Sequence, residues 1–199
     1  RGKPSAHIKF GEASAVLAGN SLLTLAFEII ADKNYSINPK LKNQIIKSLA
    51  FCSGHTGIAG GQELDLKFEN KKKSLKQIIA MQKKKTGKLF NFCLYAVGVI
   101  AKRNNKEKIL LSTLGEEIGL LFQFADDFLD VKGSRKLVGK PIKKDNKKGK
   151  STLLSLMGYE KAHNYANNLK KKILLKLKKH GKKAKDLSDT IEFILGRNF

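Results

Sequence analysis

An apolar stretch of this chain carries one glutamine and three carboxylates, in the sequence Gly119-Leu-Leu-Phe-Gln-Phe-Ala-Asp-Asp-Phe-Leu-Asp130. A helix brings residues three and four positions apart onto one face, so Asp126 and Asp127 both lie near Asp130. Gln123 lies one turn earlier. Carboxylates this close repel one another unless a cation lies between them. Mg²⁺ commonly uses one or two carboxylates with substrate phosphates, so the stretch predicts a magnesium site; the alternative is a solvated acidic face.

Helical periodicity predicts the elements that would position these residues. The carboxylate helix is expected from about Ile109 to Val131. Other helices are expected at about residues 12–31, 41–50, from Ser74, 89–100, from Ser151, 159–179 and 183–196. No segment reads as a strand, and the last two helices are amphipathic and expected to cover the core. A chain of 199 residues can bury one sizeable core, so we expect a single all-α domain over residues 1–199.

Glycines and lysines interrupt this helical pattern at three places. Four glycines follow the second helix (Gly54, Gly57, Gly60 and Gly61), which indicates either a weakened helix end or close backbone packing. Lys85-Thr86-Gly87 interrupts the helix that Ser74 caps. Residues 133–150 form a basic loop with little periodicity.

The chain is strongly basic, with 40 lysines and arginines against 17 acidic residues and a net charge of +23. Nucleic-acid-binding proteins often have such a balance. Only four of the 40 are arginine, the residue that makes bidentate contacts to bases and phosphates. The lysines are spread through every segment, so we interpret most of them as a solvated surface and expect no nucleic-acid partner.

Cysteine use and hydropathy bear on the compartment. Cys52 and Cys93 lie in apolar helical stretches without metal-ligand spacing, and we interpret both as reduced core residues. No apolar run reaches membrane-spanning length, and no signal peptide is visible, so we expect a cytoplasmic protein without stable membrane insertion.

Further polar motifs lie on both sides of the carboxylate helix. They are Arg1-Gly-Lys-Pro4, Phe10-Gly-Glu-Ala13, Leu17-Ala-Gly19, Gly60-Gly-Gln-Glu-Leu-Asp65, Lys85-Thr86-Gly87 and Gly139-Lys-Pro-Ile-Lys-Lys-Asp-Asn-Lys-Lys-Gly-Lys-Ser-Thr152. In this order and spacing the set resembles the trans-isoprenyl diphosphate synthases, and within them the bacterial farnesyl diphosphate synthases. The resemblance runs along essentially the whole chain.

The resemblance implies a fold and a reaction. The fold is an isoprenoid synthase-type helical bundle around a central substrate cavity. The reaction condenses isopentenyl diphosphate with dimethylallyl or geranyl diphosphate to give farnesyl diphosphate, with several Mg²⁺ ions that bridge two Asp motifs and the substrate diphosphate. Asp126, Asp127 and Asp130 match the second of these motifs, and Asp126 is the strongest candidate for a metal ligand.

The resemblance also assigns roles to individual positions. Lys85, Thr86, Gln123 and Asp126 match catalytic positions. Arg1 matches a position that binds isopentenyl diphosphate. The allylic diphosphate would be bound by Lys85, Thr86, Gln123, Lys140 and Lys150. Gln62 also matches a substrate-binding position and, with Asp65, would line the site.

In the family, the first Asp motif lies just before Arg-Arg-Gly-Lys-Pro, and Arg1 matches the second arginine of that pair. We therefore expect the chain to be the C-terminal part of a longer polypeptide, without the first Asp motif, and inactive by itself. The resemblance further implies a homodimer, for which residues 12–31 and 89–100 are candidate interface helices.

Several alternatives stay open. A geranylgeranyl diphosphate synthase would share every motif named above, because product length depends on residues before the first Asp motif. A non-catalytic prenyltransferase-like subunit should have lost its metal ligands and phosphate lysines, whereas this chain keeps them. A terpene cyclase would need a hydroxyl residue and a Glu where Asp130 and Ser134 stand.

Overall fold

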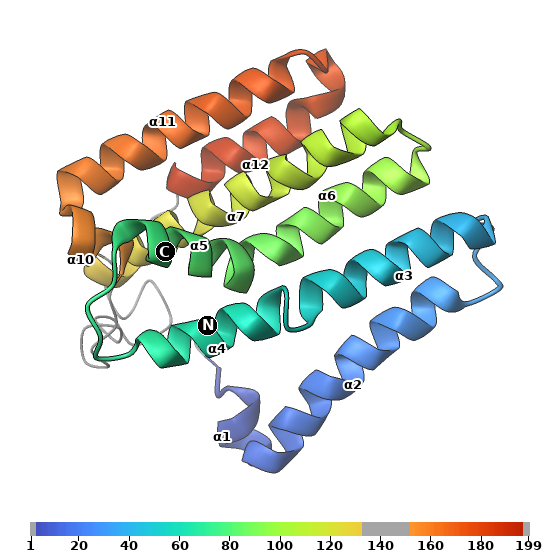
Figure 1. Cartoon of the computed structure of the whole chain (residues 1–199), viewed down its shortest axis with the longest axis horizontal. Helices are drawn as coiled ribbons and strands as arrows, with labels where there is room; N and C mark the ends of the chain where they lie inside the picture. The colour runs from blue at the N-terminus through green and yellow to red at the C-terminus, as the bar shows by residue number, and fades with distance from the viewer. Residues whose placement is uncertain (1–2, 133–151, 197–199) are drawn as a thin grey trace.

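The computed structural model describes residues 3–132 and 152–196, and every regular element in those two ranges is helical (Figure 1). The all-α prediction is therefore confirmed. The elements in chain order are α1 (Ala6–Phe10), α2 (Glu12–Ala31), α3 (Pro39–Ser53), α4 (Ile58–Phe68), α5 (Leu75–Gln82), η1 (Lys83–Gly87), α6 (Lys88–Ile100), α7 (Asn105–Lys132), α10 (Leu153–Met157), α11 (Tyr159–Lys178), η2 (Gly181–Ala184) and α12 (Lys185–Gly196).

Local side-chain caps explain where several helices begin. Pro39 starts α3, and the side chain of Asn38 accepts a hydrogen bond from the N–H of Lys40. Ser74 and Gln77 form a capping box before α5, as the sequence predicted for Ser74. Thr152 caps α10, which has only five residues and is therefore much shorter than a typical helix.

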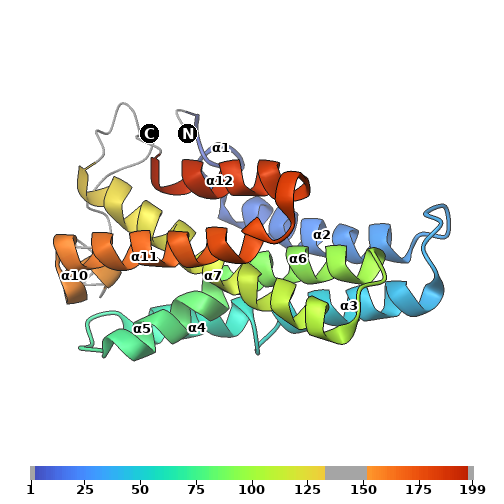
Figure 2. The same ribbon diagram turned by 90° about the horizontal axis from the view of Figure 1, so that it is seen from above.

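The carboxylate helix α7 lies at the centre of the described bundle. It packs against α6, α11 and α12, and Figure 2 shows it between α12 and α5. Leu121 and Phe124 are fully buried on α7, and they join a core to which α11 contributes Ala166 and Ile173 and α12 contributes Ile191. This burial confirms the prediction that the last two helices cover the core.

The short element η1 is a π-helix that joins α5 to α6 at the predicted interruption. Glycines let other backbones approach it. A Cβ at Gly61 of α4 would overlap the backbone of Lys85, and a Cβ at Gly119 of α7 would lie 2.6 Å from the Cα of Gly87. The close backbone packing that these glycines indicated is therefore present. The weakened helix end is present as well, since the chain leaves helical geometry between α3 and α4.

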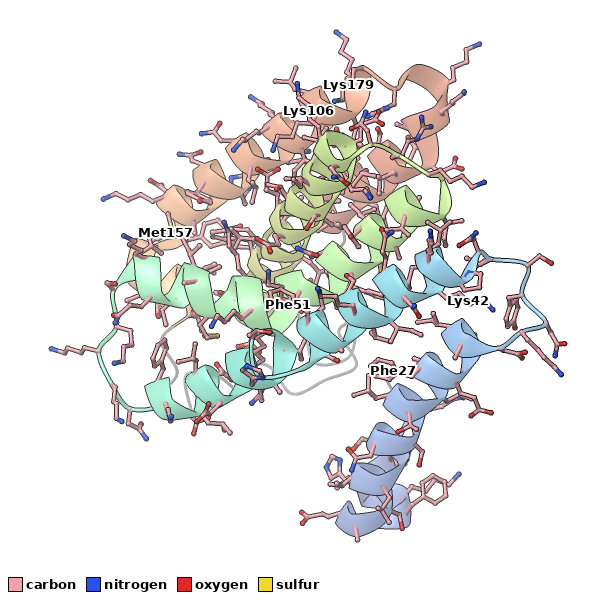
Figure 3. All side chains as sticks on the ribbon, turned by 45° about the vertical axis from the view of Figure 1, so that its right-hand side comes forward. Phe27, Lys42, Phe51, Lys106, Met157 and Lys179 are labelled. Carbon is pink, nitrogen blue, oxygen red and sulfur yellow. The ribbon has the colours of Figure 1, made fainter. Side chains whose placement is uncertain are left out.

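Helix α2 differs from the others because none of its residues is buried. Phe27, Ala26 and Ile30 are half-buried, and Phe27 lies on the side that faces α3 (Figure 3), whereas Leu17 and Leu22 are about two-thirds exposed. By length and composition alone, this helix of 20 residues is apolar enough to cross a membrane. The expectation that no apolar run reaches that length is therefore wrong.

Candidate active site

A chain of hydrogen bonds links three segments that are distant in sequence. The hydroxyl of Thr86 in η1 donates to Oε1 of Gln123 on α7, with 3.5 Å between the oxygens. Nε2 of Gln123 donates to Oδ1 of Asp127 over 2.9 Å. The other oxygen of Asp127, Oδ2, accepts from the backbone N–H of Leu153 over 3.0 Å. The predicted site residues of the Lys-Thr-Gly and carboxylate motifs therefore come together.

Lys85 is held at the same place by a partner from α4. Its Nζ lies 2.7 Å from Oδ2 of Asp65, whose side chain is only 6% exposed, whereas that of Lys85 is 30% exposed. A buried carboxylate is costly unless it is paired, so the pair fixes Lys85 at the edge of the core with part of its side chain open to solvent. Asp65 thus reaches the site as the partner of Lys85, while Gln62 is exposed on α4.

The three carboxylates of α7 have different surroundings. Asp127 is buried, whereas Asp126 and Asp130 are half-buried one helical turn apart. Among the described residues, no three His, Cys, Asp or Glu side chains are grouped closely enough to hold a metal ion. Oxygen donors at two half-buried positions still suit a hard cation that completes its shell with substrate oxygens. Metal binding by Asp126, Asp127 and Asp130 stays a prediction.

Three predicted substrate-binding residues, Arg1, Lys140 and Lys150, lie outside the described residues. So does the basic loop that contains the last two. The central substrate cavity also stays a prediction. A pocket of about 610 Å³ lies between α3, α6 and α7, but its walls include Ser48, Asn91 and Ser112 rather than the predicted catalytic residues.

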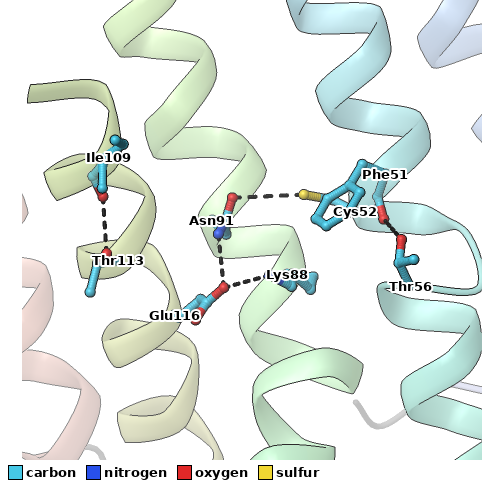
Figure 4. A network of polar contacts seen from close by, with 8 residues as sticks. All are labelled: Phe51, Cys52, Thr56, Lys88, Asn91, Ile109, Thr113 and Glu116. Atoms are coloured by element: carbon cyan, nitrogen blue, oxygen red, sulfur yellow. Dashed lines mark hydrogen bonds and ion pairs between the residues drawn. The ribbon is translucent and has the colours of Figure 1, made fainter. Parts of the chain in front are cut away.

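The sequence interpretation missed a polar network beside that pocket (Figure 4). Lys88 Nζ lies 2.6 Å from Oε1 of Glu116, which also accepts a hydrogen bond of 2.9 Å from Nδ2 of Asn91. Oδ1 of Asn91 in turn accepts a weak hydrogen bond from the Cys52 thiol. The sequence contained one sign of this network, because Asn91 interrupts an apolar run and a buried amide needs hydrogen-bond partners.

The two cysteines also differ in their surroundings. Both are free thiols, and Cys52 is buried as predicted, but Cys93 is exposed. The interpretation of Cys93 as a core residue is therefore wrong. Cys93 lies near the middle of α6, and helical periodicity did not identify which side of that apolar helix is left open.

Comparison with known proteins adds to this geometry. Residues 1–192 match the family model described as polyprenyl synthetase. Farnesyl diphosphate synthase of Micrococcus luteus is 38% identical over 168 residues, which are 84% of this chain and 57% of that protein. The chain thus spans little more than half of that relative's length.

Solved structures agree with this match. The apo structure of an FPP/GFPP synthase from Zymomonas mobilis has a TM-score of 0.85 and 36% identity, over 98% of this chain and 65% of the other. A geranyltransferase from Helicobacter pylori, complexed with magnesium and isoprenyl diphosphate, has a TM-score of 0.83 and 31% identity, over 98% of this chain and 63% of the other. The predicted isoprenoid synthase-type fold is therefore confirmed.

Proposed function

Because the chain belongs to the polyprenyl synthetase family, we propose that the protein carrying it is a Mg²⁺-dependent short-chain prenyltransferase. Its substrates would be isopentenyl diphosphate and an allylic diphosphate, dimethylallyl or geranyl, and its product farnesyl diphosphate. The contact between Thr86 and Gln123 carries this proposal, since it joins two predicted motifs that lie 37 residues apart in the chain.

The proposed reaction breaks an allylic carbon–oxygen bond and leaves positive charge on the hydrocarbon and negative charge on the diphosphate. Lys85, oriented by Asp65, has a side chain that is 30% exposed, and its ammonium would bind diphosphate oxygens. The oxygens of Thr86 and Gln123 meet one turn from the carboxylates and present partial negative charge. The positive charge of Lys85 would then lie near the departing diphosphate. The oxygens of Thr86 and Gln123 would lie near the positive charge on the hydrocarbon.

The metal requirement follows from the donor chemistry of α7. Asp126 and Asp130 would hold Mg²⁺ together with substrate oxygens, because the described side chains do not enclose an ion without them. When bound, Mg²⁺ would neutralise the departing diphosphate. The magnesium and isoprenyl diphosphate in the H. pylori geranyltransferase support this proposal.

The whole protein would be a cytoplasmic homodimer. The exposed apolar residues of α2, with those of α6 at Leu89, Val97 and Ile100, support an interface along the two helices predicted for it. A lysine-rich surface with few arginines gives no reason to add a nucleic-acid partner.

Product analysis tests the function. The protein as its gene encodes it is incubated with Mg²⁺, labelled isopentenyl diphosphate and each allylic diphosphate in turn, and the products are dephosphorylated and separated by chain length. Farnesol supports the proposal, and geranylgeraniol indicates the geranylgeranyl diphosphate synthase alternative. No condensation by folded protein with any allylic substrate would favour the non-catalytic subunit.

A further inference from the structure

Asp127 uses both oxygens of its carboxylate for hydrogen bonds within the protein. We propose that it is a positioning residue, which sets the orientation of the Gln123 amide and attaches the start of α10 to α7. The effect on turnover rests on the proposed function, because it assumes that Gln123 acts near the substrate. The two structural effects do not depend on that assumption.

The orientation of Gln123 follows from the chemistry of its neighbours. An ionised carboxylate accepts hydrogen bonds and donates none. The NH₂ end of the Gln123 side chain must therefore face Oδ1 of Asp127, which it does over 2.9 Å. The carbonyl end, Oε1, is thereby turned toward the hydroxyl of Thr86. A neutral neighbour with both a donor and an acceptor would allow the amide to turn over.

The attachment of α10 follows from the donors at its first turn. The first N–H groups of a helix have no partner within it. Thr152 Oγ1 accepts from the N–H of Ser155, and the N–H of Leu153 is left for Oδ2 of Asp127, 3.0 Å away. Leu153 is itself fully buried, so water cannot easily replace this acceptor.

Burial makes these contacts strong and selective. Asp127 is 5% exposed, and hydrogen bonds to an ionised group are shorter and stronger than neutral ones. Its two oxygens therefore act as two acceptors, and they hold Gln123 and Leu153 in place at two ends of one carboxylate. Asp126, the next residue, is half-buried.

The test begins with Asp127→Asn, which keeps the shape but can accept well with only one of its two terminal atoms. Amide exchange is followed by NMR in the protein as its gene encodes it, without Mg²⁺. We expect the Leu153 N–H or the Gln123 side-chain NH₂ to exchange about 10-fold faster, the equivalent of one weakened hydrogen bond. We expect kcat to fall at least about 10-fold while the KM for isopentenyl diphosphate stays within about 3-fold.

A double variant, Asp127→Asn with Gln123→Glu, supplies the rescue. The amide of Asn at position 127 can donate to Glu at position 123 and accept from Leu153, while Glu still accepts from Thr86. We expect exchange at Leu153 to return close to its wild-type rate. The double variant therefore tests whether hydrogen-bond direction, rather than charge at position 127, holds α10.

The opposite result is equally clear. Asp127 would be a metal ligand instead if Asp127→Asn left both exchange rates unchanged and weakened the binding of Mn²⁺, measured by electron paramagnetic resonance with inorganic diphosphate present. Failure of the double variant to restore Leu153 protection would also overturn the proposal. A wild-type protein without prenyltransferase activity would refute the proposed function but leave the exchange measurements valid.

Discussion

Asp126 and Asp127 are adjacent in sequence, yet a helix turns successive side chains by about 100° and so gives them different environments. Asp127 points into the core, where Gln123 and Leu153 use its two oxygens. Asp126 is half-buried on the same helix and remains the strongest candidate for a metal ligand. We therefore expect different roles for the two neighbouring carboxylates: Asp127 as a hydrogen-bond acceptor within the protein and Asp126 as a metal ligand.

The first prediction concerns Asp126→Asn. Loss of one preorganised charge should cost about 4 kcal/mol of transition-state stabilisation, or about three orders of magnitude in kcat/KM. Steady-state kinetics with geranyl and isopentenyl diphosphates at saturating Mg²⁺ measure it. Asp189→Asn is the control, because Asp189 is an exposed partner of Lys185 on α12. Wild-type turnover in Asp126→Asn would remove Asp126 from the metal site.

The second prediction concerns the thiols. Burial raises the pKa of the Cys52 thiol above its ordinary value of 9.0, and this outweighs the lowering by the Lys88 charge. We expect iodoacetamide at pH 8 to modify Cys52 only after unfolding. Peptide mass spectrometry with time identifies the modified site, and Cys93→Ser leaves Cys52 as the single thiol to follow. Rapid labelling of Cys52 in folded protein would contradict its burial.

The sign of the pH effect follows from the same shift. The unfolded chain loses the Cys52 proton at a lower pH than the folded chain does. The Cys52 thiol therefore makes its full contribution to the free energy of unfolding below pH 9.0. This contribution is lost as the pH rises from that value through the raised pKa.

At the scale of elements, the site depends on backbone contacts around η1. Gly61 of α4 and Gly119 of α7 both face η1 where a side chain would not fit. The π-helix widens one turn of the chain, and the two glycines let that turn approach both neighbouring helices. Lys85 and Thr86 lie on this turn, so packing of η1 decides where their side chains point.

The third prediction is therefore that Gly61→Ala destabilises the protein by about 1–3 kcal/mol, because its Cβ would push against the backbone of Lys85. Urea unfolding followed by circular dichroism measures the change. Gly196→Ala at the end of α12 is the matched control, since a Cβ there has nothing within 4 Å, and should alter stability by less than about 0.5 kcal/mol. Equal stability of both variants would show that η1 can move freely from α4.

The fourth prediction concerns the contact between α7 and α11. Lys176 Nζ lies 2.7 and 2.6 Å from the two oxygens of buried Glu117. Glu117→Gln should cost about 1–2 kcal/mol, because it removes a charge-assisted hydrogen bond to a carboxylate that is only 10% exposed. Thermal and urea unfolding measure it. Glu192→Gln breaks a pair with Lys170 in which the carboxylate is 56% exposed, and it should cost less than about 0.5 kcal/mol. An equal cost for both variants would contradict the importance of burial.

At the scale of the whole molecule, α2 leaves a long apolar surface open. Val16, Leu17 and Leu22 are each more than 60% exposed, whereas α7 and α11 are buried along one side. Several exposed apolar side chains on one helix indicate an interaction site. A second copy of the protein would cover them, which supports the homodimer that the family resemblance implies.

The fifth prediction is that Leu22→Lys converts the dimer to a monomer, because it places a charge in the proposed interface. Sedimentation velocity at micromolar concentration measures the mass. Leu175→Lys on α11 is the control, since Leu175 is as exposed as Leu22 but lies on another helix. A monomeric wild-type protein would contradict the proposal, and flotation of the wild type with lipid vesicles would indicate that α2 contacts a membrane instead.

The sequence by itself determined the features that depend on near neighbours in the chain. Ser74 marks a helix start through its side-chain hydrogen bond, and apolar periodicity identified the helix that carries the carboxylates. The motif order also predicted the family. The three carboxylates were correctly placed on one helix, and all three were predicted as metal ligands, with Asp126 as the strongest candidate.

Only the tertiary structure decided which of these residues meet across helices. The pairing of Lys85 with Asp65, the contact of Asp127 with Leu153 and the polar network around Glu116 each join separate elements. Helical periodicity fixes neighbours three and four positions apart, but it carries no information about which face of another helix packs opposite. Burial and partner choice depend on that packing, and they distinguish buried Asp127 from half-buried Asp126 on the same helix.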